Sequence, residues 1–129
     1  MSLRILHVAI SDDWEASRNF GEYEVSTRGV GLFDDGYIRA TTASGLAEVL
    51  QQRYADLQLP LLLLVIDVDA LTHAGVSVAW AGPSGGPRSS PRIEGILPMN
   101  DEVVVAALAI AREQGELAVP DVSAFDVAP

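Results

Sequence analysis

Three short apolar segments of the sequence each contain one basic residue: His7, Arg39 or Arg92. The segments are residues 5–8 (ILHV), 37–40 (YIRA) and 91–94 (PRIE). The chain has no lysine, only eight arginines and two histidines, so basic side chains are scarce. A charged group inside an apolar run must be paired with an opposite charge or take part in the function of the protein. Three basic groups that converge in one fold would form a pocket for an anion.

Each of these residues also has a purely structural interpretation. A histidine in a strand often bonds a backbone carbonyl, and His7 fits that description. Arg39 and Arg92 have many potential partners for structural salt bridges, because the chain has eighteen acidic residues. Candidate partners are acids such as Asp34, Asp35, Glu94 or Asp67. The sequence leaves both interpretations open.

Composition narrows the class of protein. A chain of 129 residues fits one domain, and the absence of cysteine excludes disulfides, thiol chemistry and cysteine-ligated zinc. A net charge of −10 argues against nucleic-acid partners and anionic membranes. The most apolar run, residues 59–68, is too short to span a bilayer, and the N-terminus lacks a signal-peptide pattern. We expect a cytoplasmic protein.

The first half of the chain predicts three strands and two short helices. Residues 3–9 alternate as a strand, with His7 on the face of Leu3 and Ile5. A helix capped by Asp12 follows and ends near Asn19. Further elements are expected at 22–26 (a short strand), 37–41 (a strand) and 45–56 (an amphipathic helix).

The second half predicts mainly strands. Residues 61–68 form a continuous apolar run that suits a central strand covered on both faces. Residues 76–80 are also a predicted strand. Residues 103–110 are expected to form a strand that runs into a helical turn, and a helix is the alternative, because the valines favour a strand and the alanines a helix. The predicted fold is α+β, with a mixed or antiparallel split β-sheet and two short helices.

Two segments are expected to have little regular structure. The Gly/Pro/Ser-rich loop 81–91 directly precedes Arg92 and is placed to act as a flap over it. The predicted domain covers residues 1–114, and residues 115–129 are expected to form a loosely held acidic tail.

Six segments together resemble the bacterial domain-of-unknown-function 952 family. They are residues 5–9 (ILHVA), 13–16 (DWEA), 21–23 (GEY), 36–42 (GYIRATT), the strand 62–67, and 91–98 (PRIEGILP). The resemblance covers roughly residues 3–110, and it rests on the order and spacing of the segments. It implies an ADP-ribosyltransferase-like fold. In proteins of that fold a first-strand basic residue contacts the ribose of NAD or a phosphate, which corresponds to His7, with contacts at Tyr37 and Arg39 from the next strand.

The chain departs from this family pattern at three positions. Arg39 and Arg92 stand where the family usually has histidine, and Glu94 stands where it usually has tyrosine. Arginine cannot serve as a general base near neutral pH, but it binds phosphate or carboxylate bidentately. Glu94 is a candidate catalytic residue, because a glutamate near the nicotinamide ribose assists ADP-ribosyl transfer. The structural alternative is an ion pair between Glu94 and Arg92 or Arg39.

Two functions from different classes follow. The first is an anion- or nucleotide-binding cleft formed by His7, Tyr37, Arg39 and Arg92, related to ADP-ribosyl or phosphoryl transfer, with NAD or a related nucleotide as the cofactor. Its ligand would be a small molecule bearing phosphate or carboxylate. The second is a non-enzymatic interaction module whose pocket is filled by an Arg–carboxylate network. We predict no metal site, because two aspartates at a strand end lack a third ligand.

Overall fold

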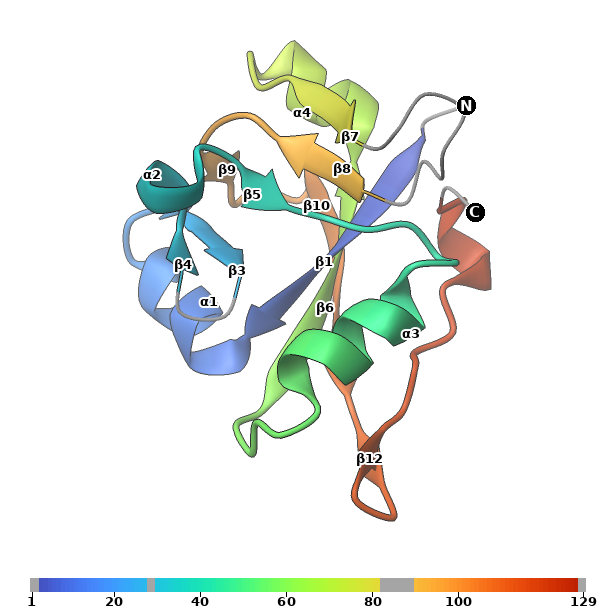
Figure 1. The fold of residues 1–129 in the computed structure, drawn as a ribbon. Coiled ribbons are helices and arrows are strands. Elements are labelled where there is room, and N and C mark those ends of the chain that lie inside the picture. The colour runs from blue at the N-terminus through green and yellow to red at the C-terminus, as the bar shows by residue number, and fades with distance from the viewer. Residues whose placement is uncertain (1–2, 28–29, 82–89, 128–129) are drawn as a thin grey trace.

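The computed structural model describes residues 3–27, 30–81 and 90–127. Two three-stranded sheets form the body of the protein, and short helices lie around them (Figure 1). Every pairing between the named strands is antiparallel. The predicted α+β class with an antiparallel sheet arrangement is therefore confirmed.

The first sheet provides the core of the molecule. It has the order β1 (Arg4–Ile10), β6 (Leu61–Asp67), β10 (Val104–Ile110). β6 is central, as its continuous apolar sequence predicts, because both of its faces are covered. β1 pairs with β6 without a register shift, so His7 lies opposite Leu64.

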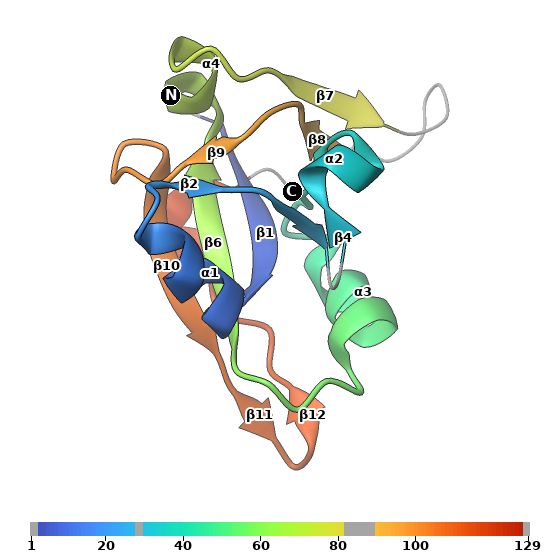
Figure 2. The same ribbon diagram turned by 90° about the vertical axis from the view of Figure 1, so that its left-hand side faces the viewer.

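The second sheet is shorter and lies across one side of β1 (Figures 1 and 2). It has the order β5 (Ile38–Arg39), β8 (Ser90–Ile93), β7 (Val78–Ala81). Ile38 and Ile93 are opposite one another and fully buried. Because side chains alternate along a strand, the next pair, Arg39 and Arg92, faces away from that core.

Short strand pairs and helices complete the fold. The pairs are β2 (Glu22–Tyr23) with β9 (Leu97–Pro98), β3 (Val25–Thr27) with β4 (Val30–Gly31), and β11 (Arg112–Glu113) with β12 (Glu116–Leu117). The helices are α1 (Ser11–Arg18), α2 (Leu32–Asp35), α3 (Leu46–Val49), which continues as a π-helical segment (Leu50–Tyr54), α4 (Val68–His73) and a 3-10 turn (Ser123–Phe125).

Two apolar cores lie on opposite faces of the first sheet. On β1, Ile5 and Ala9 belong to the first core, while Leu6 and Val8 belong to the second. His7 shares the face of Ile5, as its position in the strand predicts. The second core is closed by α3 and its π-helical extension, whose i, i+4 positions are Leu46, Leu50 and Tyr54. The helix thereby comes to lie beside β1 (Figure 1).

Several predictions about the helices were wrong. α1 begins at Ser11, and Asp12 lies in its first turn without capping it. Two short helices that the sequence does not predict are also present: α2, which ends just before Gly36, and α4, which follows β6. Asp67 caps the N-terminus of α4, because its carboxylate accepts a hydrogen bond from the backbone N–H of Ala70 (2.9 Å). The fold thus has more than two short helices.

The C-terminal part is more ordered than the sequence indicates. β10 is a strand to Ile110, as predicted, but the expected helical turn is replaced by the β11–β12 hairpin. Val122, Phe125 and Val127 pack against the second core. Arg4 donates to the carbonyl of Phe125, so the end of the chain contacts its beginning. The domain boundary at residue 114 stays a prediction.

The predicted flap over Arg92 lies mainly at residues 82–89, outside the described residues. Among the residues that are described, no helix is long and apolar enough to cross a membrane.

Candidate functional site

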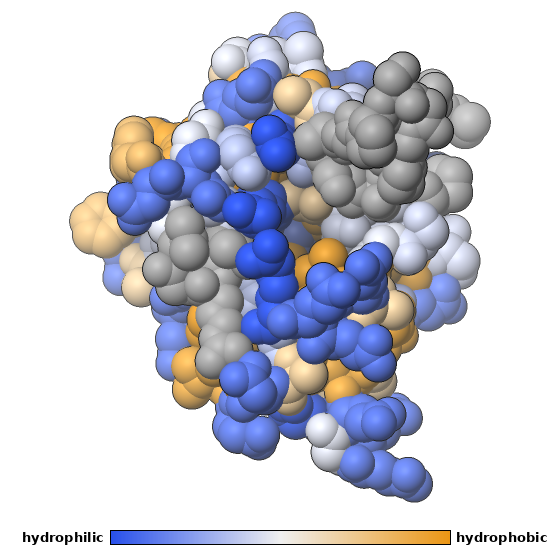
Figure 3. Space-filling model, in the orientation of Figure 1, coloured by the Kyte–Doolittle hydropathy of each residue, from blue (hydrophilic) through white to orange (hydrophobic). Residues whose placement is uncertain are grey.

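A cleft of about 190 Å³ lies between the second sheet, β1 and the α3 helix. The residues that line it are Leu6, His7, Val8, Ser26, Tyr37, Arg39, Ala40, Thr41, Val49, Arg53, Tyr54, Pro91 and Arg92. The four ligand-binding candidates from the sequence, His7, Tyr37, Arg39 and Arg92, are therefore adjacent to one space. In Figure 3 strongly hydrophilic surface runs down the middle of this face, beside a recess.

Arg39 and Arg92 are direct cross-strand neighbours in this cleft. They occupy opposite positions in the β5–β8 ladder. Like charges directly opposite one another on antiparallel strands destabilise the pair. Moreover, three of the six arginines in the described part of the chain, counting Arg53, line the cleft. An acidic protein thus gathers its scarce cations in one place.

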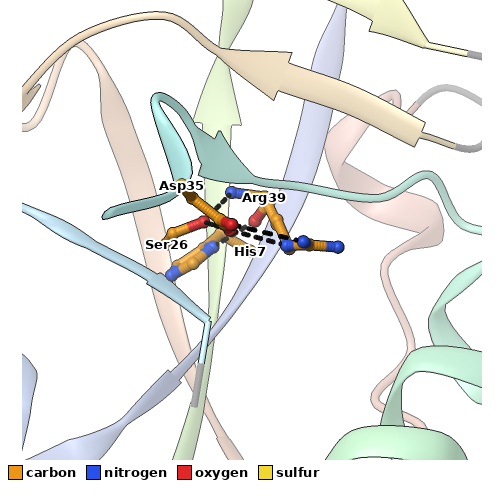
Figure 4. A network of polar contacts seen from close by, with 4 residues as sticks. All are labelled: His7, Ser26, Asp35 and Arg39. Atoms are coloured by element: carbon orange, nitrogen blue, oxygen red, sulfur yellow. Dashed lines mark hydrogen bonds and ion pairs between the residues drawn. The ribbon is translucent and has the colours of Figure 1, made fainter. Parts of the chain in front are cut away.

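Arg39 is held by a network that involves α2 and β3 (Figure 4). Its Nε donates to Asp35 Oδ2 (2.7 Å) and its Nη2 to Asp35 Oδ1 (3.3 Å). Ser26 donates to the same carboxylate (2.6 Å) and accepts from the backbone N–H of Arg39 (3.3 Å). The hydrogen bonds from Arg39 and Ser26 hold the pKa of Asp35 below its usual value. The same pairing with Asp35 raises the pKa of Arg39.

This network orients Arg39 without exhausting its donors. A guanidinium has five N–H groups, and Asp35 takes one from Nε and one from Nη2. The remaining three N–H groups, on Nη1 and Nη2, can bind a ligand. The side chain is 39% exposed, so solvent or a ligand can reach it. Arg39 therefore forms the expected salt bridge with Asp35 and still has N–H groups that can bind a ligand.

Arg92 has a different environment. Its guanidinium lies over the ring of Tyr37, with the central carbon 4.2 Å from the ring centroid. Arg39 lies farther from the same ring, at 5.6 Å. No carboxylate among the described residues forms an ion pair with Arg92. Stacking on Tyr37 fixes the plane of the guanidinium and leaves its N–H edge available.

His7 is a buried, neutral residue with both ring nitrogens engaged. Its side chain lies beneath β5, and the residue is 2% exposed. Nδ1 lies 2.6 Å from the carbonyl of Arg39, which can only accept, so Nδ1 carries the proton. Nε2 then accepts from the hydroxyl of Tyr23 (3.1 Å). Burial lowers the pKa of His7 from 6.5 to about 4. The hydrogen bond to the Arg39 carbonyl raises this pKa, but by less than burial lowers it.

The role of His7 is therefore to fix β5 against β1. Its bond to the Arg39 carbonyl holds the backbone that carries the arginine, while the Tyr23 ring packs edge-on against the imidazole at 5.4 Å. The structural interpretation of His7, a strand histidine bonded to a backbone carbonyl, describes these contacts. Because both nitrogens are engaged and the ring is neutral, His7 lines the cleft without offering a free proton donor or acceptor to it.

Arg53 lines the cleft from the helix side and was not among the predicted site residues. The pattern of the helix contained the signal, because Arg53 shares the apolar face with Val49 and Leu50, where an arginine is unusual. The charge of Arg53 also contributes to lowering the pKa of Asp35, although less than the residues that bond it directly.

Glu94, the candidate catalytic residue, is not among the residues that line the cleft. It is exposed and follows the end of β8, where its backbone N–H donates to the carbonyl of Ser77 (2.8 Å). Alternation along a strand places Glu94 on the Arg92 face only if the strand continues, and β8 ends at Ile93. The suggested ion pairs of Glu94 with Arg39 or Arg92 are not formed. In the described residues, no cluster of three or more potential ligands could hold a metal ion.

The fold and the cleft define the protein as a small antiparallel α+β domain with an arginine-lined pocket at the junction of two sheets. The family described as "Protein of unknown function (DUF952)" matches residues 8–107, and the chain belongs to that family.

Two solved structures are similar to this chain along most of its length. Protein CC0527 from Caulobacter crescentus is 19% identical and has a TM-score of 0.69, covering 89% of this chain and 93% of its own. A double mutant of the same protein gives 17% identity and a TM-score of 0.70, with the same coverage. At this identity the likeness shows a shared fold. A search of curated proteins finds no match.

Proposed function

We propose that the cleft binds a small molecule through an anionic group, a phosphate or a carboxylate, held between Arg39 and Arg92. The observation that carries the proposal is the placement of these two arginines directly opposite one another on β5 and β8. An anion between them would convert a repulsive pair into two charge-assisted interactions. Tyr37 and Asp35 hold the two guanidinium groups at this position.

The apolar residues that line the cleft favour a ligand that has an organic part in addition to its anionic group. Leu6, Val8, Val49 and Pro91 provide apolar surface next to the arginines. Binding sites for small molecules commonly combine such apolar walls with a few fixed polar groups. A nucleotide such as NAD, or a fragment of one, belongs to this class of ligand, and we propose it on the resemblance to ADP-ribosyltransferase-like proteins. The division into two small sheets supports that fold assignment.

The chemistry of the site favours binding and positioning over acid–base catalysis. The neutral His7 has both nitrogens engaged, and an arginine cannot accept a proton near pH 7. If the cleft supports ADP-ribosyl or phosphoryl transfer, the arginines would act by orienting the phosphate and stabilising charge. Glu94 would need to move toward the cleft to take part.

The alternative function, a non-enzymatic interaction module with a filled pocket, has one observation in its favour. Asp35 pairs with Arg39 and Ser26, which is the Arg–carboxylate network that this alternative requires. The network involves one arginine and leaves Arg92 stacked on a ring instead of paired with an acid. We therefore prefer the anion-binding function.

Thermal denaturation with and without ligand tests the proposal. Methyl phosphate, acetate, ADP-ribose and NAD would each be added at millimolar concentration, since a ligand at ten times its Kd stabilises a protein by about 1.4 kcal/mol. We expect at least one to stabilise the wild type and to lose most of its effect in Arg92→Gln. Arg18→Gln is the matched control, because Arg18 is an exposed arginine on α1 away from the cleft. Absence of stabilisation by all four ligands would refute the proposal.

A further inference from the structure

We propose that the ligand carries a second hydrogen-bond acceptor, which binds the backbone N–H of Val8 at the floor of the cleft. This inference rests on the proposed function, because it assumes that the first end of the ligand is held by Arg39 and Arg92. It narrows the ligand to a two-ended class: small organic phosphates or dicarboxylates, with an acceptor oxygen at the end opposite the arginines.

The direction of the Val8 N–H follows from the pairing of β1. The N–H and carbonyl of Leu6 both bond Thr41, on the side away from β6, at 2.8 and 2.7 Å. Residues two apart in a strand direct their backbone groups to the same side. The β1–β6 register is regular through Val8, so its N–H and carbonyl also point away from β6. The carbonyl confirms this direction, because the hydroxyl of Tyr54 donates to it (3.4 Å).

The Val8 N–H has no acceptor among the described residues. The pairing with Thr41 ends before it, since the chain turns toward α3 after Thr42. Val8 is only 4% exposed, and it lines the cleft. Buried backbone N–H groups without a partner are rare and unfavourable, so each one requires an explanation. A ligand oxygen in the cleft would supply the missing acceptor.

The polar groups of the cleft indicate what kind of ligand fits. Arg39 and Arg92 only donate, and so does the Val8 N–H. The carboxylate of Asp35 is already engaged by Arg39 and Ser26. A ligand with acceptors at both ends satisfies these donors, whereas an amine or another cation would be repelled by the positive charge of the two arginines. The apolar residues that also line the cleft, among them Leu6 and Val49, suit a short carbon chain or ring.

Titrations followed by ¹⁵N NMR test the inference, with Val8 N–H and Arg92 Nε–H as separate reporters. Methyl phosphate and acetate are one-ended probes, and 2-phosphoglycolate and succinate are their two-ended counterparts. We expect all bound probes to shift Arg92, and only a two-ended probe to move the Val8 amide proton downfield. The two-ended member of a pair should also bind about tenfold more tightly, as one additional hydrogen bond implies.

The two proposals fail in different ways. If Arg92 responds and Val8 does not respond to either two-ended probe, the further inference is wrong and anion binding stands. If neither reporter responds to any probe, both proposals are wrong. Val8→Pro removes the backbone N–H at a position where this N–H bonds no neighbouring strand. The variant should therefore lose nearly all of the tenfold preference for two-ended probes, whereas Val8→Ala, which retains the N–H, should keep that preference. Should Val8→Pro not fold, the wild-type titration alone decides.

Discussion

Because His7 is buried and neutral, we predict that the free energy of unfolding of this protein falls on mild acidification. In the unfolded chain His7 has the ordinary pKa of 6.5, and in the folded chain burial lowers the pKa to about 4. Between these values the unfolded state binds the proton and the folded state does not. The contribution of His7 is therefore fully present above pH 6.5 and is lost as pH falls toward 4.

The size of the effect follows from the two pKa values. Each unit of difference is worth about 1.4 kcal/mol, so the full loss is about 3 kcal/mol, reached near pH 4. By pH 5 about 2 kcal/mol is already lost, which is a large part of the stability of an ordinary domain. This loss has a structural cause, because a protonated Nε2 of His7 can no longer accept a hydrogen bond from the hydroxyl of Tyr23.

Urea denaturation from pH 8 to pH 5 measures this loss, with His7→Asn as the control. Asparagine does not titrate, whereas the carboxylates titrate in both proteins, so the difference between the two pH profiles isolates His7. We expect the wild type to lose about 2 kcal/mol more than the variant. Parallel profiles would refute the reasoning. NMR titration of the His7 imidazole would then show whether it is buried and neutral.

Three further predictions concern the elements around the cleft. Burial, with smaller contributions from Tyr54 and Asp13, raises the pKa of Tyr23, so absorbance at 295 nm should show it ionising only as the chain unfolds, and Tyr23→Phe should remove that late step. Asp67→Ala should destabilise the protein by about 1–2 kcal/mol in urea by removing the α4 cap and a partner of Arg4, while Asp67→Asn should retain the cap. Gly36→Ala should cost about 1 kcal/mol, because φ is +85° at the end of α2 although a methyl group there contacts nothing. An unchanged urea midpoint would contradict either of the last two.

The long elements of the fold could be predicted from the sequence because their patterns are strong. The apolar run of β6 has no surface-facing polar residue, so it must be central. The helix that contains Leu46, Leu50 and Tyr54 has one continuous apolar face. Short elements could not be predicted in the same way. α2 and β5 have four and two residues, and their conformations depend on tertiary contacts such as the Asp35–Arg39 pair.

The sequence singled out some of the residues that line the cleft, but it did not indicate their contacts. An unusual residue in an apolar segment identified His7, Arg39 and Arg92, and all three line one cleft. The contacts of His7 and Arg92 are made with residues far away in the sequence, which no local pattern contains, whereas Asp35 lies only four residues before Arg39. His7 is neutral because Tyr23 and the Arg39 carbonyl occupy its nitrogens. Glu94 was placed by strand alternation one residue past the end of β8, and it does not line the cleft.

The central claim is that Arg39 and Arg92 form an anion-binding pair. A crystal structure of the wild type grown with methyl phosphate tests it most directly. The account predicts one tetrahedral anion between the two guanidinium groups, with Asp35 still bonded to Arg39 and Arg92 still stacked on Tyr37. A cleft without an anion, in which Arg92 has turned to pair with a carboxylate, would contradict it.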